Sequence, residues 1–329
     1  MNHQIARRAT TLAFVTLAGL ALCGVEPALA QAYPSKPITL VVPYPAGGAN
    51  DMLGRLLGQK MSEALNTQVI VDNKPGAAAL LGANAVAKSA PDGYTILVGG
   101  LATHAASPHL IKADYDPLKD FEAIGLIGSA PIVATTNVEP KYKNLKDLVD
   151  AAKKDPGSVM YGSSGNGSPL HLAGELFVAN TGTQMTHVPY KGGSAHTLDL
   201  IGGRLDVIFD TTTAAMANIK GGKIKAIAIA LPKRSPDLPD VPTFAEAGFP
   251  EFNFSAWYGM FAPAKTPKDV VAKLSGALQT ALKNPEVIEK LKGVGVTTAS
   301  GDAGELAKLV PVEYERIGKL IKAANIKAD

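Results

Sequence analysis

The sequence predicts an α/β protein of two lobes, each a mainly parallel sheet flanked by helices. Short apolar runs rich in Val and Ile alternate with amphipathic helix patterns from Ile38 onward, and runs that are apolar on both faces are typical of buried parallel strands. Two glycine-rich turns, at residues 43–50 and 162–168, each join such a strand to a helix. The chain has 329 residues, which favours about two domains once an export signal is set aside.

The first thirty residues are interpreted as an export signal. Arg7 and Arg8 give a positive start, residues 12–25 are almost wholly apolar, and residues 28–30 form a small-x-small cleavage site. The apolar run is too short for a membrane-spanning helix. We therefore expect cleavage before Gln31 and a protein of the periplasm.

Two other export routes fit the signal less well. Cys23 offers a lipid anchor, but Leu22 is a poor residue before a lipidated cysteine. The Arg7-Arg8 pair suggests twin-arginine export, but Ala9-Thr10 after it is a poor match. The general secretory route is the interpretation that we carry forward.

Charge and cysteine content exclude further classes. The chain has 32 basic and 29 acidic residues and a formal net charge of +3, whereas a nucleic-acid binder carries a strong basic excess. Its one cysteine, Cys23, lies in the expected signal. The exported protein would thus have no disulfide in an oxidising compartment, and its stability would depend on its hydrophobic core.

Strand and helix patterns alternate along the exported chain, which predicts layers of sheet and helix with right-handed crossovers. The predicted strands are 38–43, 68–72, 94–98, 123–127, 131–136, 159–161, 186–189, 206–209 and 224–230. The predicted helices lie near 50–65, 77–89, 144–154, 169–180, 193–201, 266–282, 284–292 and 302–324.

Two segments are predicted to cross between the lobes. The stretch 121–136 is apolar without a strong turn, and the run 224–230 leads into a proline-rich segment that would return to the first lobe. These crossings predict a discontinuous first lobe, 31–128 with 231–329, and a second lobe, 129–230.

The first glycine-rich turn is a candidate anion site. Glycine allows a sharp turn and close backbone approach to a ligand, and a helix start presents unpaired N–H groups and the positive end of the helix dipole. Asp51 would repel a carboxylate, so we expect it to cap its own helix. The candidate ligand contacts are Tyr44, Ala46, Gly47, Gly48, Ala49 and Asn50, and for Tyr44 a place in the core is the alternative.

The second turn repeats this arrangement. Ser168 is followed by Pro169, the residue pair expected at a helix N-cap and first helical position. His171 then falls in the first helical turn, where a structural role is as plausible as a ligand contact. The candidate contacts are Ser163, Ser164, Gly165, Asn166, Ser168 and His171.

Further candidates follow other predicted strands, at the carboxyl edge where α/β sheets bind ligands. They are Thr103, His104, Tyr190 and Asp210, with Lys191 treated as a solvated charge. Asp210 would suit an ammonium or a hydroxyl on the ligand, or a hinge hydrogen bond. Trp257 is interpreted as packing between the lobes, because large aromatic residues are usually core.

Catalytic and cofactor motifs are missing from the sequence. The turn at Gly162 lacks the Gly-x-Ser-x-Gly spacing of a nucleophile elbow. No phosphate-loop, dinucleotide or His-Glu-x-x-His pattern occurs. We therefore expect no enzyme activity, no cofactor and no metal.

Ordered blocks along the chain carry a family resemblance. They are residues 42–51 (VPYPAGGAND), 73–77, 91–95, 115–121, 162–175, 187–193, 239–243 and 257–267. Together they resemble the Bug family, the periplasmic solute receptors of tripartite tricarboxylate transporters, over essentially the whole exported chain. Three positions depart from the family pattern: Asn50 stands where Thr or Ser is frequent, Ala78-Ala79 where Gly-Gly is common, and Ser107 where Asn is usual.

The resemblance implies a fold and a function. It implies a Venus flytrap of the periplasmic-binding-protein type that closes on a small organic carboxylate in the cleft between its lobes. In that family the carboxylate is gripped mainly by backbone amides, neutral side chains and bridging waters. The implied partners are the carboxylate and the membrane permease subunits of a tripartite transporter, with no nucleic acid and with the receptor itself a monomer.

Two rival functions are compatible with the sequence. A receptor of the same fold could hand its closed form to a signalling protein, and neighbouring permease genes would separate that function from transport. A secreted α/β enzyme is disfavoured by the missing catalytic arrangement. The identity of the carboxylate is open: dicarboxylates, amino acids and aromatic acids all fit a clamp of backbone amides.

Overall fold

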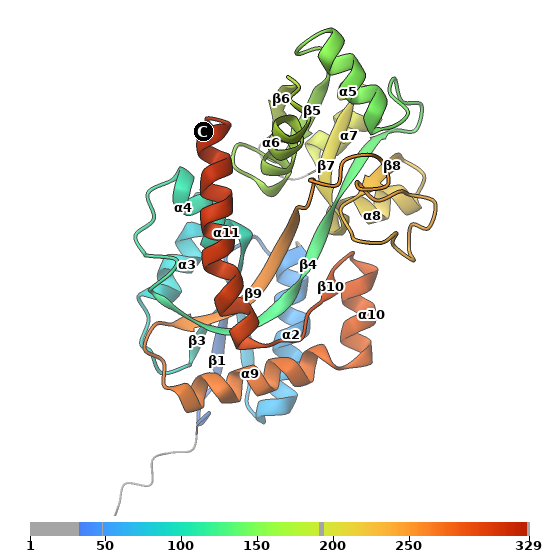
Figure 1. Ribbon diagram of the computed structural model, residues 1–329. Coiled ribbons are helices and arrows are strands. Elements are labelled where there is room, and N and C mark those ends of the chain that lie inside the picture. Colours follow the sequence, from blue (N-terminus) through green and yellow to red (C-terminus); the bar gives the residue numbers. More distant parts are fainter. Residues whose placement is uncertain (1–32, 48, 191–193, 328–329) are drawn as a thin grey trace, which may run out of the picture. The chain divides into compact units, whose positions relative to one another are not determined.

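The computed structural model describes residues 33–47, 49–190 and 194–327 (Figure 1). Residues Lys36–Asp329 form one compact unit. The expected signal, residues 1–30, lies outside the described residues. In the part of the chain that is described, no helix is both long and apolar enough to span a membrane.

The first sheet is built on three parallel strands, in the order β2 (Val69–Asn73), β1 (Ile38–Val42) and β3 (Thr95–Gly100). The side chains of β1 and β3 are nearly all buried, because each strand is covered on both faces. Strand β9 (Ser255–Pro263) continues the sheet antiparallel to β3. The short strand β10 (Thr297–Thr298) pairs with strand β4 (Phe121–Asn137).

The second sheet has a matching set of parallel strands, in the order β6 (Thr186–Pro189), β5 (Met160–Ser163) and β7 (Val207–Thr211). Strand β8 (Ile224–Ile229) lies in the same sheet, paired antiparallel to β4. Each sheet therefore combines three parallel strands with antiparallel pairing: β9 runs antiparallel to β3 in the first sheet, and β8 runs antiparallel to β4 in the second.

One long strand, β4 (Phe121–Asn137), belongs to both sheets. Its residues 121–131 pair with β9, and its residues 132–137 pair with β7 and β8. The sequence predicts two strands here, at 123–127 and 131–136, whereas the structure has one strand with β-bulges near Gly125 and Gly128. A side chain at either position would collide with the backbone of the segment 297–301. Because both positions are glycine, the bulged strand can pass close to this segment and continue.

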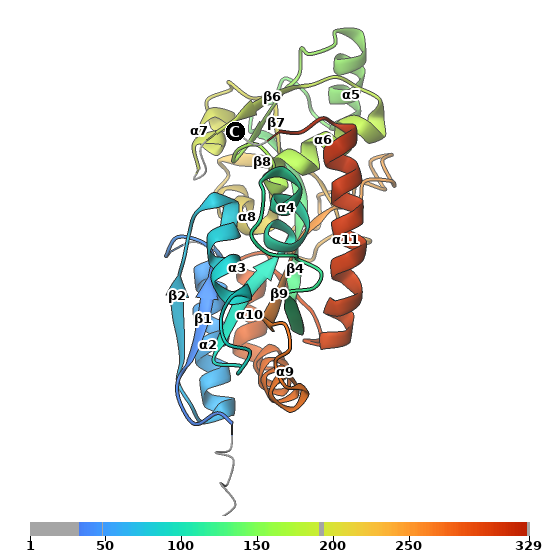
Figure 2. The same ribbon diagram turned by 90° about the vertical axis from the view of Figure 1, so that its left-hand side faces the viewer.

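Helices cover both sheets (Figures 1 and 2). Helix α2 packs on α9, and α11 lies along β4 and also reaches α6. Against the second sheet, α6 packs on β7, α7 on β5 and α8 on β4. The bounds are α2 (Ala49–Leu65), α3 (Leu80–Ala87), α5 (Leu145–Lys154), α6 (Pro169–Thr181), α7 (Ala195–Ile201), α8 (Thr212–Lys220), α9 (Lys268–Leu282), α10 (Pro285–Gly293) and α11 (Ala303–Ala323).

Several elements were not among those predicted from the sequence. They are β9, β10, α8, the π-helix η2 (Ala102–Ala106) and α4 (Ser107–Leu110). The helix predicted near 77–89 is present as a 3-10 turn, η1 (Ala77–Ala79), followed by α3 (Leu80–Ala87). In η1, Ala78 and Ala79 have φ of +51° and +74°, a left-handed conformation that favours glycine. These are the two positions at which the sequence departs from the Gly-Gly of the Bug family.

A continuous apolar core extends beneath both sheets. It includes Val41 and Leu97 from the first sheet and Tyr161 and Phe209 from the second. The core joins the sheets through β4, whose pairing partners change between Pro131 and Ile132. The chain returns after β8 through residues 230–254 into β9.

Candidate functional site

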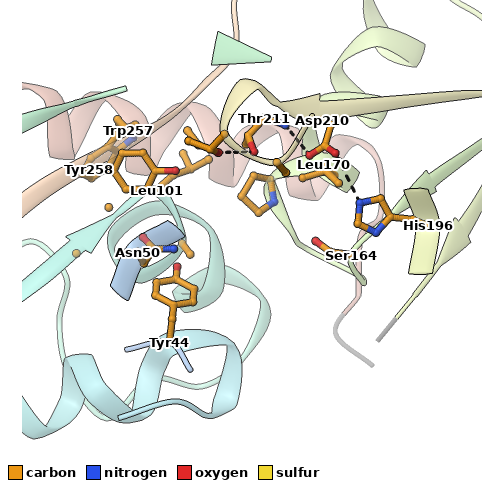
Figure 3. A pocket seen from close by; sticks show the side chains of 17 residues that line it. Tyr44, Asn50, Leu101, Ser164, Leu170, His196, Asp210, Thr211, Trp257 and Tyr258 are labelled. Atoms are coloured by element: carbon orange, nitrogen blue, oxygen red, sulfur yellow. Dashed lines mark hydrogen bonds and ion pairs between the residues drawn. The ribbon is translucent and has the colours of Figure 1, made fainter. Parts of the chain in front are cut away.

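A cavity of about 390 Å³ lies where elements of the two sheets face each other (Figure 3). It adjoins the carboxyl ends of β3 and β7 and the turns that follow β1 and β5, the edge at which open α/β sheets bind ligands. We call it the main cavity. Its lining residues are Tyr44, Asn50, Gly99, Gly100, Leu101, Ala102, Ser164, Pro169, Leu170, His196, Asp210, Thr211, Thr213, Ala214, Ala256, Trp257 and Tyr258.

A second hollow of about 360 Å³ extends the main cavity, and we call it the side cavity. The two share Tyr44, Ala102, Ser164 and Pro169 as wall residues. The side cavity is lined further by the second glycine-rich turn, including Asn166 and Ser168. Both glycine-rich turns therefore contribute to one connected site.

The first turn is held together by Asp51. Its buried carboxylate accepts a hydrogen bond from the Gly47 backbone N–H at 2.9 Å and from Asn73 Nδ2 at 3.0 Å, and it pairs with Arg55 Nε at 3.0 Å. The hydrogen bond from Arg55 is the main reason that the pKa of Asp51 falls to about 2. The backbone N–H that Asp51 accepts belongs to Gly47, just before α2, so Asp51 holds the turn that leads into the helix. Asp51 does not line the main cavity.

Within the first turn, two side chains reach the main cavity. Asn50, in the first turn of α2, and Tyr44 both line it. Burial raises the pKa of the Tyr44 hydroxyl, which keeps its proton and can donate to a ligand. Ala46 and Gly47 are exposed and are not among the wall residues.

Two first-turn candidates have less structural information. Gly48 lies outside the described residues, and Ala49 is described only as the first residue of α2. Their expected backbone contacts with a ligand therefore stay a prediction.

In the second turn, Ser164 lines both cavities, and Asn166 and Ser168 line the side cavity. Ser168 is also the N-cap of α6, because its hydroxyl accepts the His171 backbone N–H at 3.3 Å. The sequence interpretation of Ser168 as N-cap before Pro169 is confirmed.

Three other residues of this region lie behind the cavity wall. Ser163 is fully buried, with its hydroxyl 2.7 Å from His187 Nε2 and accepting the Gly165 N–H at 3.1 Å. His171 Nδ1 accepts the Gly167 N–H at 3.0 Å, and its ring stacks on His187 at 3.8 Å between centroids. Ser163, Gly165 and His171 thus shape the turn, and the structure does not place them in the lining.

Thr103 and His104 were expected at the ligand, but the structure buries them in the core. The π-helix η2 turns His104 inward, where its ring stacks on Phe261 with 3.8 Å between centroids. Burial lowers the pKa of His104 to about 3, so its ring is neutral. Thr103 holds the start of η2 by accepting the Gly100 N–H at 2.9 Å. Only the segment 99–102 in this region reaches the main cavity.

Tyr190 is a neighbour of the site and not a wall residue. Its hydroxyl donates to Asp199 Oδ2 at 2.6 Å, and its ring lies 6.3 Å from that of His196. Burial, followed by the hydrogen bond to Asp199, raises the pKa of Tyr190 to about 12. Lys191 lies outside the described residues.

Asp210 and His196 face the main cavity as a pair (Figure 3). Asp210, in β7, is 2% exposed, and its Oδ1 accepts the Thr211 N–H at 2.7 Å. His196, in the first turn of α7, is 4% exposed, and its Nε2 lies 3.7 Å from Asp210 Oδ2. Among the described residues, neither ring nitrogen of His196 has a hydrogen-bond partner. The sequence analysis singled out Asp210 and missed His196, although His196 begins a helix at the same sheet edge.

Two aromatic residues of β9 close the main cavity. Trp257 is 3% exposed, and Tyr258 follows it in the cavity wall. Trp257 also lines a hollow of about 740 Å³ together with residues of α11, including Glu313 and Arg316, which we call the rear cavity. Trp257 therefore belongs to the apolar core and borders the candidate site as well, whereas its packing between the lobes stays a prediction.

The main cavity has an unusual charge distribution for an anion site. Among its described lining residues there is no Lys or Arg, and Asp210 is the one acidic residue. An anion bound here would depend on backbone N–H groups, on the starts of α2 and α6, and on neutral donors such as Asn50 and Ser164. No group of side chains within the described ranges could hold a metal ion.

Comparison with known proteins gives consistent results. A family model described as "Tripartite tricarboxylate transporter family receptor" matches residues 53–326. The chain is 42% identical over 320 residues to a protein from the TAR-I ttuE-ttuC' intergenic region of Agrobacterium vitis, covering 94% of this chain and 91% of that protein. It is 32% identical over 316 residues to the protein BugT of Bordetella pertussis, covering 95% and 96%.

Solved structures of other proteins also resemble this chain over most of its length. Rpa4515 of R. palustris with adipate matches with a TM-score of 0.80 at 33% identity, covering 90% of this chain and 100% of that one. MatC of Rhodopseudomonas palustris with bound malate matches with a TM-score of 0.77 at 33% identity, covering 88% and 100%. The predicted α/β fold, two lobes with a ligand cleft between them, is confirmed by these matches together with the two sheets described above.

Proposed function

We propose that this chain, which belongs to the receptor family of tripartite tricarboxylate transporters, binds a small organic carboxylate in the main cavity and delivers it to the membrane subunits of such a transporter. The single observation that carries the proposal is that both glycine-rich turns, represented by Asn50 and Ser164, line one connected site although they lie far apart in the sequence. Relatives of this chain bind adipate and malate, both carboxylates, in structures of the same fold.

The proposed binding mode uses dipoles in place of cations. The starts of α2 and α6 both border the site through Asn50 and Pro169. Each helix start carries a partial positive charge and unpaired N–H groups. A carboxylate between them would be attracted by both lobes at once.

We propose that binding closes the two lobes around the ligand. Strand β4 connects the two sheets, because it pairs with β9 in the first and with β7 and β8 in the second. A ligand that contacts both sides favours the closed form by its differential affinity. The lobe boundaries in this proposal are those expected from the sequence: 31–128 with 231–329, and 129–230.

The family consists of receptors, and relatives of known structure such as BugD are periplasmic binding proteins. For this chain we propose cleavage of the signal before Gln31, a monomeric receptor in the periplasm, and no enzymatic turnover of the ligand. Amino-terminal sequencing of the exported protein and incubation of the purified protein with its ligand test these points.

A thermal-shift screen of the exported protein against a library of carboxylates tests the function. A carboxylate present at one hundred times its dissociation constant is expected to add about 2.7 kcal/mol to the free energy of unfolding. The variant Asn50→Leu removes a donor from the cavity wall and should reduce the shift, whereas Asn84→Leu, which lines neither cavity, should leave it unchanged. A library in which no carboxylate stabilises the protein would refute the proposal.

A further inference from the structure

We infer that His196 and Asp210 form a subsite for a hydroxyl group, so that the ligand is a hydroxycarboxylate. This inference rests on the proposed function, since it assumes that a carboxylate occupies the main cavity. It adds that the ligand carries a hydroxyl group as well as its carboxylate, and that His196 and Asp210 recognise this hydroxyl.

The pair is buried, polar and incompletely hydrogen-bonded. His196 is 4% exposed and Asp210 is 2% exposed, and both line the main cavity. Among the described residues, neither ring nitrogen of His196 has a hydrogen-bond partner. Buried polar groups are nearly always paired, and each one left unpaired costs about 1–3 kcal/mol. Two unpaired nitrogens at a cavity wall indicate that a ligand or water supplies the missing partner.

The spacing of the pair allows one group to contact both atoms from the side. His196 Nε2 and Asp210 Oδ2 are 3.7 Å apart, which is too long for a direct hydrogen bond. Asp210 Oδ1 already accepts the Thr211 N–H, so Oδ2 is the acceptor that faces His196. A group located beside both atoms must donate to Asp210 and interact with His196 at the same time.

A hydroxyl meets both requirements. The neighbouring carboxylate favours a proton on His196 Nε2, which makes that nitrogen a donor. A hydroxyl donates its hydrogen to Asp210 Oδ2 and accepts the N–H of His196 through its oxygen. An ammonium could donate to Asp210 but would face the His196 N–H with no acceptor to offer. A methylene would leave both groups unpaired.

The same pair determines how the ligand lies. A carboxylate beside Asp210 would meet a like charge in a buried setting, where repulsion is only weakly screened. The carboxylate therefore belongs at the opposite wall, near Tyr44 and Asn50. Figure 3 shows Tyr44 and Asn50 across the cavity from Asp210 and His196. The ligand would thus carry its carboxylate at one end and a hydroxyl toward the other.

The test uses matched sets of acids that differ at one position. They are propionate, lactate and alanine; butyrate, 3-hydroxybutyrate and 3-aminobutyrate; and succinate, malate and aspartate. Titration calorimetry on the exported protein is expected to show, in at least one set, the hydroxyl member binding ten-fold or more tightly than its parent acid and its amino analogue. Sites built to bond a hydroxyl reject the analogue that lacks it by large factors.

Variants of His196 and Asp210 test whether the preference for the hydroxyl acid comes from these two residues. Asp210→Asn and His196→Ala should each reduce the hydroxyl preference to less than three-fold, and His196→Gln, which keeps an N–H donor, should restore part of it. Asp199→Asn is the matched control on α7, since Asp199 lines neither cavity, and should keep the full preference. Circular dichroism identifies variants that do not fold. The variants of His196 and Asp210 that do fold then show whether the hydroxyl preference depends on this pair.

Two results would overturn the inference. One is that the hydroxyl member exceeds its parent acid in none of the three sets. The other is that the preference survives in every folded variant of His196 and Asp210. Neither result would refute the receptor function, which is refuted only if the whole carboxylate library fails to bind.

Discussion

At the scale of single residues, Asp51 shows how a charged side chain supports an anion site without entering it. Its carboxylate accepts the Gly47 N–H and Asn73 Nδ2 and pairs with Arg55. An acidic residue in the first turn of α2 is stabilised by the helix dipole. The negative charge is thus neutralised within the turn and is kept away from the cavity.

We predict that Asp51→Asn lowers the free energy of unfolding by about 1–2 kcal/mol, because charge-assisted hydrogen bonds are lost. The folded pKa of about 2 lies below the unfolded value of about 3.9. The carboxylate therefore stabilises the protein above about pH 4, and this contribution disappears as the pH falls toward 2. Urea unfolding at pH 7 and at low pH measures both effects.

The control is Asp150→Asn. Asp150 is exposed and pairs with Lys146 on the surface of α5, so its loss should cost less than about 1 kcal/mol. Equal losses for the two variants would contradict the role given to Asp51.

Some of the residues that the sequence singled out lie at the cavity wall. Ser164 directly follows β5 and Asn50 lies in the first turn of α2, and both line the main cavity, while their contact with a ligand stays a prediction. Thr103 and His104 also follow a strand, but one π-helical turn rotates them into the core. His196 was missed because its place in the site depends on how α7 packs on β5, which no local pattern reveals.

At the scale of elements, the start of α3 is conformationally strained. Ala79, its N-cap residue, has φ of +74° and makes no side-chain capping hydrogen bond. A left-handed conformation costs an L-residue roughly 1–2 kcal/mol, and glycine avoids most of this cost.

We predict that Ala79→Gly raises the free energy of unfolding by about 1 kcal/mol, as measured by urea unfolding. The matched control is Ala85→Gly, at an exposed position within α3, where glycine should instead lower stability by about 0.5–1 kcal/mol. The prediction fails if both substitutions destabilise the protein by the same amount.

The elements that sequence analysis missed lack a clear local sequence pattern. Strand β9 mixes small and aromatic residues, such as Ala256, Trp257 and Gly259, so it lacks the aliphatic run that marked the other strands. Helix α8 begins directly after β7 without a turn between them, which hides its start. Strands such as β1 and β7, which are buried over all or nearly all of their length, were the easiest to predict.

At the scale of the whole molecule, the connections between the two sheets determine what binding can do. Strand β4 changes its pairing partners between Pro131 and Ile132, and β9 accompanies it only up to that point. A short change of backbone direction there would move one sheet relative to the other while leaving each sheet intact. Hinges of this kind need only a few residues.

We predict that a carboxylate identified by thermal shift reduces the radius of gyration in small-angle X-ray scattering of the exported protein. Asn166→Trp places a bulky side chain in the side cavity and should weaken binding and prevent the compaction. Lys153→Trp on α5, an exposed position that lines neither cavity, should behave as the native protein does. Tight binding with an unchanged scattering profile would argue against closure, provided that an apo structure is open.

The chain contains one tryptophan, and it stands at the boundary between the main and rear cavities. Its indole is almost completely shielded from water at 3% exposure. Intrinsic fluorescence therefore comes from a single, well-defined place, and any ligand that displaces water or shifts β9 there is expected to change the emission. The unlabelled protein thus contains its own optical reporter of occupancy, which makes stopped-flow binding kinetics accessible without adding a dye.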